Sequence, residues 1–197
     1  MVFERLKRQF FERNTKIVAI DLLGKYIIRE TPKGNIIGKI IDVEAYLGPE
    51  DKASHSYNYK KTERTLPMYM KPGTLYIYLI YGLHFCLNVI TESEGIPCAV
   101  LIRQLFPIDG IEIMIENRNV KSGKSYRNLT DGPGKLCMAL NITKDQFNGI
   151  DSCSYDSKLF FSKGEIIKKD SIKASKRIGI DYAKEDKDRL LRFTIKS

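Results

Sequence analysis

The sequence predicts an α+β fold, a single mixed domain over residues 1–197 with a mainly antiparallel β-sheet and flanking helices. Three observations lead to this expectation. Apolar residues alternate along several runs of strand length, the longest of which spans 73–90. Turns that contain Gly or Pro separate neighbouring runs, as in hairpins. Short segments with the apolar spacing of helices lie between them, and neither an internal repeat nor a linker is evident.

Length and charge limit the class of protein. A chain of 197 residues and 22.6 kDa favours one domain. Hydrophobic content of 43% and charged content of 29% predict a packed core rather than disorder. The net charge of +9, from 33 Lys and Arg against 24 Asp and Glu, favours an anionic partner, with nucleic acid first. A generally basic proteome would explain the same charge.

The cysteines and the N-terminal residues bear on compartment and cofactors. Of the four cysteines, Cys86 and Cys137 have apolar neighbours and are expected to be core thiols. Together with Cys98 and Cys153 they form no C-x-x-C motif and no spacing typical of a zinc site. We therefore expect a reducing cytoplasm and no structural metal. The charged start lacks the apolar core of a signal peptide, and no run approaches the ~20 residues of a membrane span.

Two helices are expected before the first strand. Residues 2–12 place apolar side chains on one side of a short helix. Asn14 or Thr15 is suited to cap a second helix, which stops at Gly24. Three segments then form a hairpin: a strand over 26–29, a turn over 31–35 and a strand over 36–46.

Glu44 lies inside the apolar second strand of this hairpin and is the first candidate functional residue. An unpaired carboxylate in a strand interior is costly to desolvate. The strand breaks at Leu47-Gly48-Pro49, the acidic pair Glu50-Asp51 and His55 follow, and a helical turn is expected over 51–57. A carboxylate, a turn and a histidine suggest a pocket. A structural ion pair with a Lys or Arg explains Glu44 equally well.

The next two segments carry basic and aromatic residues. Residues 57–73, YNYKKTERTLPMYMKPG, form a loop whose composition suits contact with nucleic acid, although an ordinary surface excursion is the alternative. The run 73–90 alternates as two strands with Tyr81-Gly82-Leu83 as the turn. Tyr81 is then at a hairpin tip, where small polar residues are usual. The tip either has a function or folds under another element.

The second half of the chain continues the mixed pattern. Cys98 to Phe106 is predicted to be a buried strand that Arg103 interrupts and Pro107 ends. The glycine-rich start of a helix at Lys135 has free N–H groups of the kind that hold phosphate. The other elements expected are a helix over 110–118, a basic flexible segment over 121–128, a helix over 135–140, and strands over 159–161, 172–178 and 190–195.

Four of these segments together resemble the alkyladenine (3-methyladenine) DNA glycosylase family. They are VEAYLGPEDKASHS (43–56), MKPGTLYIYLIYGLHFCLNV (70–89), AVLIRQLFP (99–107) and DGPGKLCMAL (131–140). With the lead-in from Thr15 the resemblance covers nearly the whole chain, and the tail past residue 150 matches more loosely. It implies a curved sheet with a protruding, DNA-inserting β-hairpin. It also implies a monomeric, DNA-associated repair enzyme without a cofactor.

The resemblance implies a reaction and a role for each candidate residue. The enzyme would hydrolyse the N-glycosidic bond of damaged purines flipped out of double-stranded DNA. Glu44 corresponds to the carboxylate that activates water, and Arg103 to the arginine that helps to position that water. The remaining roles are base stacking by Tyr46, His55 and Tyr78, exclusion of normal guanine by Asn88, insertion into DNA by Tyr81, and DNA binding by Arg64, Tyr76 and Lys135.

Simple chemistry agrees with these roles. Alkylated purines such as 3-methyladenine are cationic, so tyrosine faces attract them. Arg103 is expected to keep Glu44 ionised, because a nearby cation lowers a carboxyl pKa. Three positions depart from the family pattern: Thr65 after Arg64, Asp42 where Glu is common, and His84 where some members have Tyr. These departures could alter DNA contacts or base preference.

Two other functions fit part of the pattern. A non-catalytic module that binds distorted duplex would keep the basic patches and Tyr81 but would not need Glu44 beside Arg103. A bifunctional lyase would need a desolvated Schiff-base lysine, and no lysine in the sequence is marked as one. The sequence does not rank 3-methyladenine, 7-methylguanine, hypoxanthine and ethenoadenine as substrates.

Overall fold

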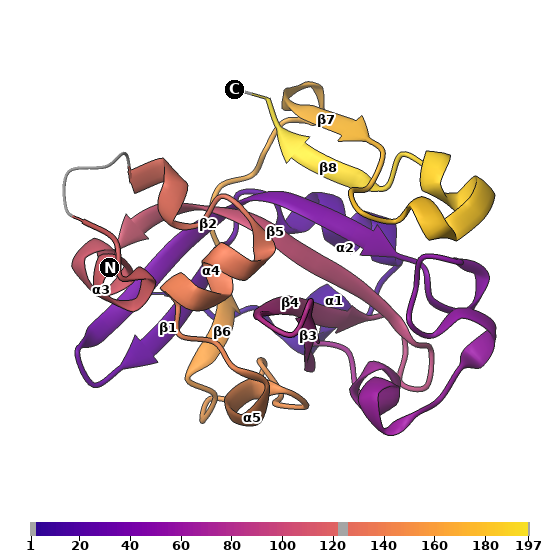
Figure 1. Cartoon of the computed structure of the whole chain (residues 1–197), viewed down its shortest axis with the longest axis horizontal. Coiled ribbons are helices and arrows are strands. Elements are labelled where there is room, and N and C mark those ends of the chain that lie inside the picture. The colour runs from indigo at the N-terminus through magenta and orange to yellow at the C-terminus, as the bar shows by residue number, and fades with distance from the viewer. Residues whose placement is uncertain (1–2, 122–125, 197) are drawn as a thin grey trace.

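The computed structural model describes residues 3–121 and 126–196 and confirms the α+β class. Along this part of the chain, eight strands form one curled sheet, in which all strand pairs are antiparallel (Figure 1). The order is β3-β4-β5-β2-β1-β6, and β8 joins β7 to β2. The strands are β1 (Tyr26–Thr31), β2 (Gly34–Tyr46), β3 (Leu75–Ile80), β4 (His84–Thr91), β5 (Cys98–Asp109), β6 (Leu159–Ser162), β7 (Ile172–Ser175) and β8 (Arg192–Ile195).

Short helices pack against this sheet, and the buried side chains of α2 and α4 share one hydrophobic core with those of β2 and β5. Figure 1 shows α2 behind β2 and β5, and α4 in front of them. Asn14 caps α2 as expected, since its side chain accepts from the N–H groups of Lys16 and Ile17. The helices are α1 (Arg8–Phe11), α2 (Thr15–Leu22), α3 (Ile111–Arg118), α4 (Pro133–Ala139) and α5 (Lys144–Phe147).

The long central strands β2 and β5 carry the catalytic candidates. Glu44 lies opposite Leu101 in the register of these strands. The register shifts twice nearby, because Ile41 on β2 and Arg103 on β5 are each passed over in the pairing. Such bulges re-aim side chains next to active sites. Ile36, Ile40, Val43 and Ala45 fill the core from β2, which explains why this strand is buried along most of its length.

The tyrosine-rich run folds as an antiparallel hairpin of β3 and β4. Leu75 pairs with Val89 and Ile80 with His84, so Tyr81-Gly82-Leu83 form the turn, as predicted. Tyr81 has φ of 53° and Gly82 φ of 69°. An aromatic residue rarely adopts a positive φ, and such strained residues gather at functional sites. Tyr81 is 83% exposed, so the tip does not fold under another element.

Several expected boundaries were wrong. The first helix spans only Arg8–Phe11, the segment 51–57 has turns and bends rather than a helical turn, and the strand expected over 172–178 ends at Ser175. Pro107 does not end β5, which continues to Asp109. The N–H of Leu105 bonds to Thr130 on the side away from β2, and residue 107 faces that same side. The missing N–H of Pro107 therefore breaks no bond to β2.

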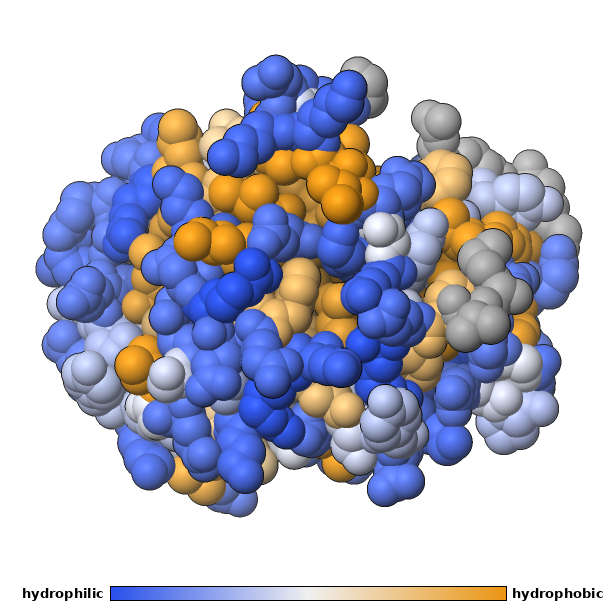
Figure 2. Space-filling model, turned by 180° about the vertical axis from the view of Figure 1, so that it is seen from behind, coloured by the Kyte–Doolittle hydropathy of each residue, from blue (hydrophilic) through white to orange (hydrophobic). Residues whose placement is uncertain are grey.

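The core thiols are confirmed, since Cys86 and Cys137 are buried. Residues 122–125 of the basic segment expected over 121–128 lie outside the described residues. Seen from behind, the surface is mainly hydrophilic, with apolar residues gathered below the β7–β8 projection at the top (Figure 2). No helix in the described ranges is both long and apolar enough to cross a bilayer.

Candidate active site

A cavity of about 530 Å³ lies between the β3–β4 hairpin, the loop after β2 and the segment that follows β7. Its size is typical of a small-molecule site and suits a purine. Eight of the residues predicted from the sequence line it: Tyr46, His55, Arg64, Tyr76, Tyr78, Tyr81, Asn88 and Arg103. Further lining comes from Met68, Leu101, Pro133, Ile178, Ile180 and Tyr182, among others.

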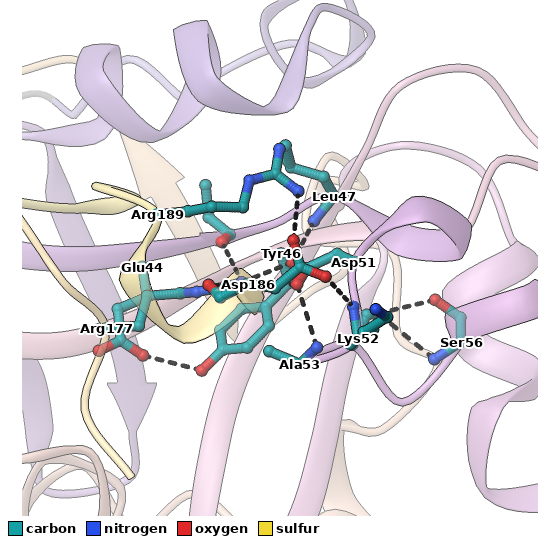
Figure 3. A network of polar contacts seen from close by, with 12 residues as sticks. Glu44, Tyr46, Leu47, Asp51, Lys52, Ala53, Ser56, Arg177, Asp186 and Arg189 are labelled. Atoms are coloured by element: carbon teal, nitrogen blue, oxygen red, sulfur yellow. Dashed lines mark hydrogen bonds and ion pairs between the residues drawn. The ribbon is translucent and has the colours of Figure 1, made fainter. Parts of the chain in front are cut away.

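Glu44 lies directly behind the wall of this cavity and has no exposed surface. Its Oε1 is 3.1 Å from Nη1 of Arg103 and accepts a 2.8 Å hydrogen bond from the N–H of Ile178. Its Oε2 accepts a 2.8 Å hydrogen bond from the hydroxyl of Tyr46 (Figure 3). All three partners line the cavity. The carboxylate is therefore paired and satisfied, and it is one residue layer away from any bound molecule.

The pKa of Glu44 is raised above its ordinary value. Burial is the largest cause, while Arg103, the Ile178 amide and the Tyr46 hydroxyl oppose it and Asp42 adds to it. The expected contact with Arg103 is thus present and lowers the pKa of Glu44 as predicted, but the effect of burial outweighs it. A carboxylate with a raised pKa is a stronger base than a free one, and at neutral pH it suits proton abstraction.

Tyr46 is held between two charged groups. Its hydroxyl bonds Glu44, and the guanidinium of Arg177 lies over its ring, 4.7 Å from the centroid. Arg177 is itself fully buried and bonds both oxygens of Asp51 as well as the carbonyl of Ala45 (Figure 3). Asp51 of the acidic pair after β2 therefore belongs to a buried ion pair that holds the wall of the cavity.

Three aromatic side chains form the opposite wall. The rings of His55 and Tyr78 are 4.6 Å apart at 77°, and those of Tyr76 and Tyr78 are 5.5 Å apart at 38°. The hydroxyl of Tyr76 is 2.9 Å from Nδ1 of His55. Burial, with Arg64 and Lys60 adding to it, lowers the pKa of His55 to about 4. His55 is therefore neutral at physiological pH and does not repel a cationic base.

Arg64 and Asn88 provide polar groups at this wall. Arg64 is exposed, its guanidinium is 5.2 Å from the ring centroid of Tyr78, and its Nη2 is 3.5 Å from Nε2 of His55. Asn88 is buried and donates its amide hydrogens to the carbonyls of Tyr76, at 3.0 Å, and Cys86. Because these donors face the strand, the Asn88 oxygen is left for the cavity side.

The chain is similar to known proteins over nearly its whole length. The methylpurine-DNA glycosylase family matches residues 9–197. The chain belongs to this family. A protein from Clostridium novyi is 48% identical over 98% of this chain and 96% of its own length, and one from Desulfitobacterium hafniense is 46% identical over 96% and 94%. One from Clostridium tetani is 48% identical over 97% and 95%; all three are provisionally named 3-methyladenine DNA glycosylase.

Family membership makes the chain a DNA glycosylase, a hydrolase of base-excision repair whose partner is DNA. Among the described residues, no group of three or more His, Cys, Asp and Glu side chains is arranged to hold a metal ion. Nothing in the cavity therefore assigns a metal site.

One predicted residue lies apart from the rest. Lys135 pairs with Asp131 at 2.8 Å on the first turn of α4 and does not line the main cavity. It borders a smaller hollow with Arg118 and Lys121 instead. The neighbouring Gly134 is important in another way, because a Cβ there would come within 2.9 Å of His84, next to the turn of the hairpin.

Sequence reasoning missed the segment from Arg177 to Tyr182. In the sequence, Arg177 is one of seven Lys and Arg residues between 158 and 177, and nothing marks it as different from the others. Its side chain is nevertheless fully buried. The amide of Ile178 bonds Glu44, and Tyr182 lines the cavity and donates to the carbonyl of Ala53 at 3.2 Å. The only local signal for this segment is the dipeptide Ile178-Gly179 between a basic run and a tyrosine. The neighbouring sequence does not indicate that it lies beside Glu44.

Proposed function

We propose that this chain is a monofunctional glycosylase that excises alkylated or deaminated purines from duplex DNA as a single-domain monomer, leaving an abasic site. 3-Methyladenine, 7-methylguanine, hypoxanthine and ethenoadenine are the proposed bases. The observation that carries the proposal is the buried Glu44–Arg103 pair directly behind an aromatic cavity. A module that only binds DNA has no use for a buried ion pair at this place.

Base recognition follows from the walls of the cavity. A flipped purine would stack between Tyr46 on one side and His55 and Tyr78 on the other. Flipping costs a few kcal/mol of stacking and pairing. Tyr81, exposed at the hairpin tip, would fill the gap in the duplex and recover part of this cost. Asn88 would reject normal guanine.

Hydrolysis would use Glu44 as the base. A carboxylate has about four acceptor positions, and Oε2 receives only the Tyr46 hydroxyl, so it has room for one more donor. A small shift of the wall would admit a water there, and catalytic contacts often tighten only when substrate binds. A proton of the water passes to Glu44, and the water oxygen forms a bond to C1′ of the sugar. The base leaves with the electrons of the glycosidic bond.

The remaining cations would hold the DNA backbone. Arg64 is exposed beside the cavity and is suited to a phosphate near the flipped nucleotide. Tyr76 supports this edge through its bond to His55. Lys135 would contact DNA outside the cavity.

A base-release assay tests this proposal. Methylated duplex DNA is incubated with the protein, and free 3-methyladenine and strand breaks are measured separately, with borohydride present in a parallel reaction. We expect free base, no strand cleavage and no trapped covalent complex. Absence of release, or release by Glu44→Gln at the wild-type rate, would contradict the proposal, and a borohydride-trapped complex would assign a lyase.

A further inference from the structure

Four charged side chains of alternating sign run from the C-terminal strand to Glu44. Arg192 on β8 donates to Asp42 on β2, with Nε 3.0 Å from Oδ1 and Nη2 2.7 Å from Oδ2. The same Oδ2 is 3.7 Å from Nε of Arg103 on β5. Nη1 of Arg103 is in turn 3.1 Å from Oε1 of Glu44. The guanidinium of Arg103 therefore lies between two carboxylates.

The backbone places these residues for that purpose. Asp42 is paired on both sides, opposite Gln104 of β5 and Thr194 of β8. Arg103 has no residue opposite on β2, because the register passes from Gln104 to Ile102. A bulge of this kind turns a side chain out of the regular alternation. Arg103 can then occupy the space between Asp42 and Glu44, which lie on one face of β2.

These side chains are largely shielded from solvent, so their charges act more strongly on one another than at the surface. The side chain of Asp42 is 6% exposed, that of Arg103 14% and that of Arg192 26%. Nε of Arg103 is buried and has no hydrogen-bond partner within bonding distance. Its attachment to Asp42 is thus electrostatic, and the guanidinium is shared rather than committed to Glu44.

We propose that Asp42 and Arg192 are positioning residues that together set how closely the Arg103 guanidinium approaches Glu44, and so set the pH range in which Glu44 accepts a proton. The inference rests on the proposed role of Glu44 as water activator. Arg192 neutralises Asp42 and limits its attraction for Arg103. Asp42 draws the guanidinium back from Glu44. The charged and titratable groups that face Glu44 are Asp42 and Tyr46 of β2, Tyr78 of β3, Cys86 of β4, Arg103 of β5, Arg177 and Tyr182 of the segment after β7, and Arg192 of β8.

The two positioning residues should act in opposite directions. Asp42→Asn removes a negative neighbour and leaves Arg103 to Glu44 alone, so the acid limb of the rate profile should move to lower pH. Arg192→Gln leaves the Asp42 charge uncompensated, so Arg103 is drawn towards Asp42 and the limb should move to higher pH. We expect each shift to be about one pH unit and the plateau rate to fall ~10-fold or more.

The experiment measures single-turnover excision of one lesion duplex from pH 5 to 9 by wild type, Asp42→Asn, Arg192→Gln and the conservative Arg192→Lys. Any titration of the substrate is common to all variants. The ¹³C shift of the Glu44 carboxyl is titrated in the same free proteins. Opposite displacement of both the rate limb and the Glu44 titration, with partial rescue by Arg192→Lys, supports the proposal.

Arg8→Gln is the matched control, because it removes a partly buried arginine–carboxylate pair, Arg8–Asp151, that does not line the cavity. Displacement in the same direction, or no displacement despite a folded protein by thermal unfolding, would overturn the proposal. If a variant fails to fold, the other variant and its titration decide. Failure of the proposed function is distinguishable, because Glu44→Gln would then retain activity whatever Asp42 and Arg192 do.

Discussion

Removal of the Tyr46 hydroxyl isolates one of the three contacts that keep Glu44 ionised. In Tyr46→Phe the ring and its contact with Arg177 remain, but Oε2 of Glu44 loses its 2.8 Å hydrogen bond. The Tyr46 hydroxyl is one of the groups that lower the pKa of this carboxyl, after Arg103 and the Ile178 amide. Without this bond, only Arg103 and the Ile178 amide oppose the effect of burial, so the pKa of Glu44 must rise further.

The size of the effect follows from the energy of such a bond. A hydrogen bond to a charged group contributes about 1.5–3 kcal/mol, and 1.36 kcal/mol corresponds to one pH unit. The acid limb should therefore move up by about one to two pH units. Glu44 must be deprotonated to act as a base, so activity is lost at the low-pH side first. The pKa of Tyr46 is raised well above 10, mainly by burial, so Tyr46 itself does not titrate in this range.

Single-turnover base release across pH, with enzyme in excess, measures this limb. Tyr182→Phe is the matched control, since it removes another hydroxyl at the same cavity that bonds the Ala53 carbonyl rather than Glu44. The limb should move in Tyr46→Phe and stay in place in Tyr182→Phe. An unmoved limb in Tyr46→Phe, or an equal shift in both variants, would show that the Tyr46 hydroxyl does not control the ionisation of Glu44.

Three further outcomes are expected. Arg177→Met leaves Asp51 as a buried, unpaired charge and should lower the free energy of unfolding in urea by about 3–5 kcal/mol. Lys176→Met, which breaks an exposed ion pair, should leave the free energy of unfolding unchanged. Equal effects of the two variants would show that the buried pair has no special structural role. With a pKa of about 4, His55 should not titrate between about pH 5.5 and 8. His55→Gln should therefore lower the excision rate without changing the shape of the pH profile in that range. A limb near pH 6.5 in the wild type that vanishes in His55→Gln would contradict this expectation. Tyr81→Ala should weaken binding to abasic-site DNA ~10-fold and binding to undamaged duplex much less. Tyr155 is similarly exposed on another part of the surface, and Tyr155→Ala should weaken neither. Equal losses of affinity for the two DNAs in Tyr81→Ala would exclude a wedge role.

Local patterns in the sequence were enough for the sheet and the hairpin. The alternation over 73–90 predicts both strands and their turn, because side chains on a strand change face at every residue. Asn14 predicts the start of α2, because a cap depends on the next few residues only. The cavity residues followed from their resemblance to a family, and the structure brings most of them together.

Long-range polar pairs were beyond reach of such patterns. Arg177 bonds Asp51 across 126 positions and Arg192 bonds Asp42 across 150, and no spacing rule links residues so far apart. The net effect on Glu44 was also hidden, since burial and Arg103 act on its pKa in opposite directions and only the packed structure gives their balance. Pro107 shows the same limit, because its effect depends on which side of β5 lacks a partner strand.

The central claim is that Glu44 acts on the chemical step rather than on DNA binding. Its most direct test is Glu44→Gln, with the single-turnover excision rate and the Kd for a lesion duplex measured on the same preparation. We expect a rate lower by a factor of about 10² to 10⁴ with Kd changed by less than about threefold. A rate within about threefold of wild type, or a loss of rate explained by loss of binding, would contradict it.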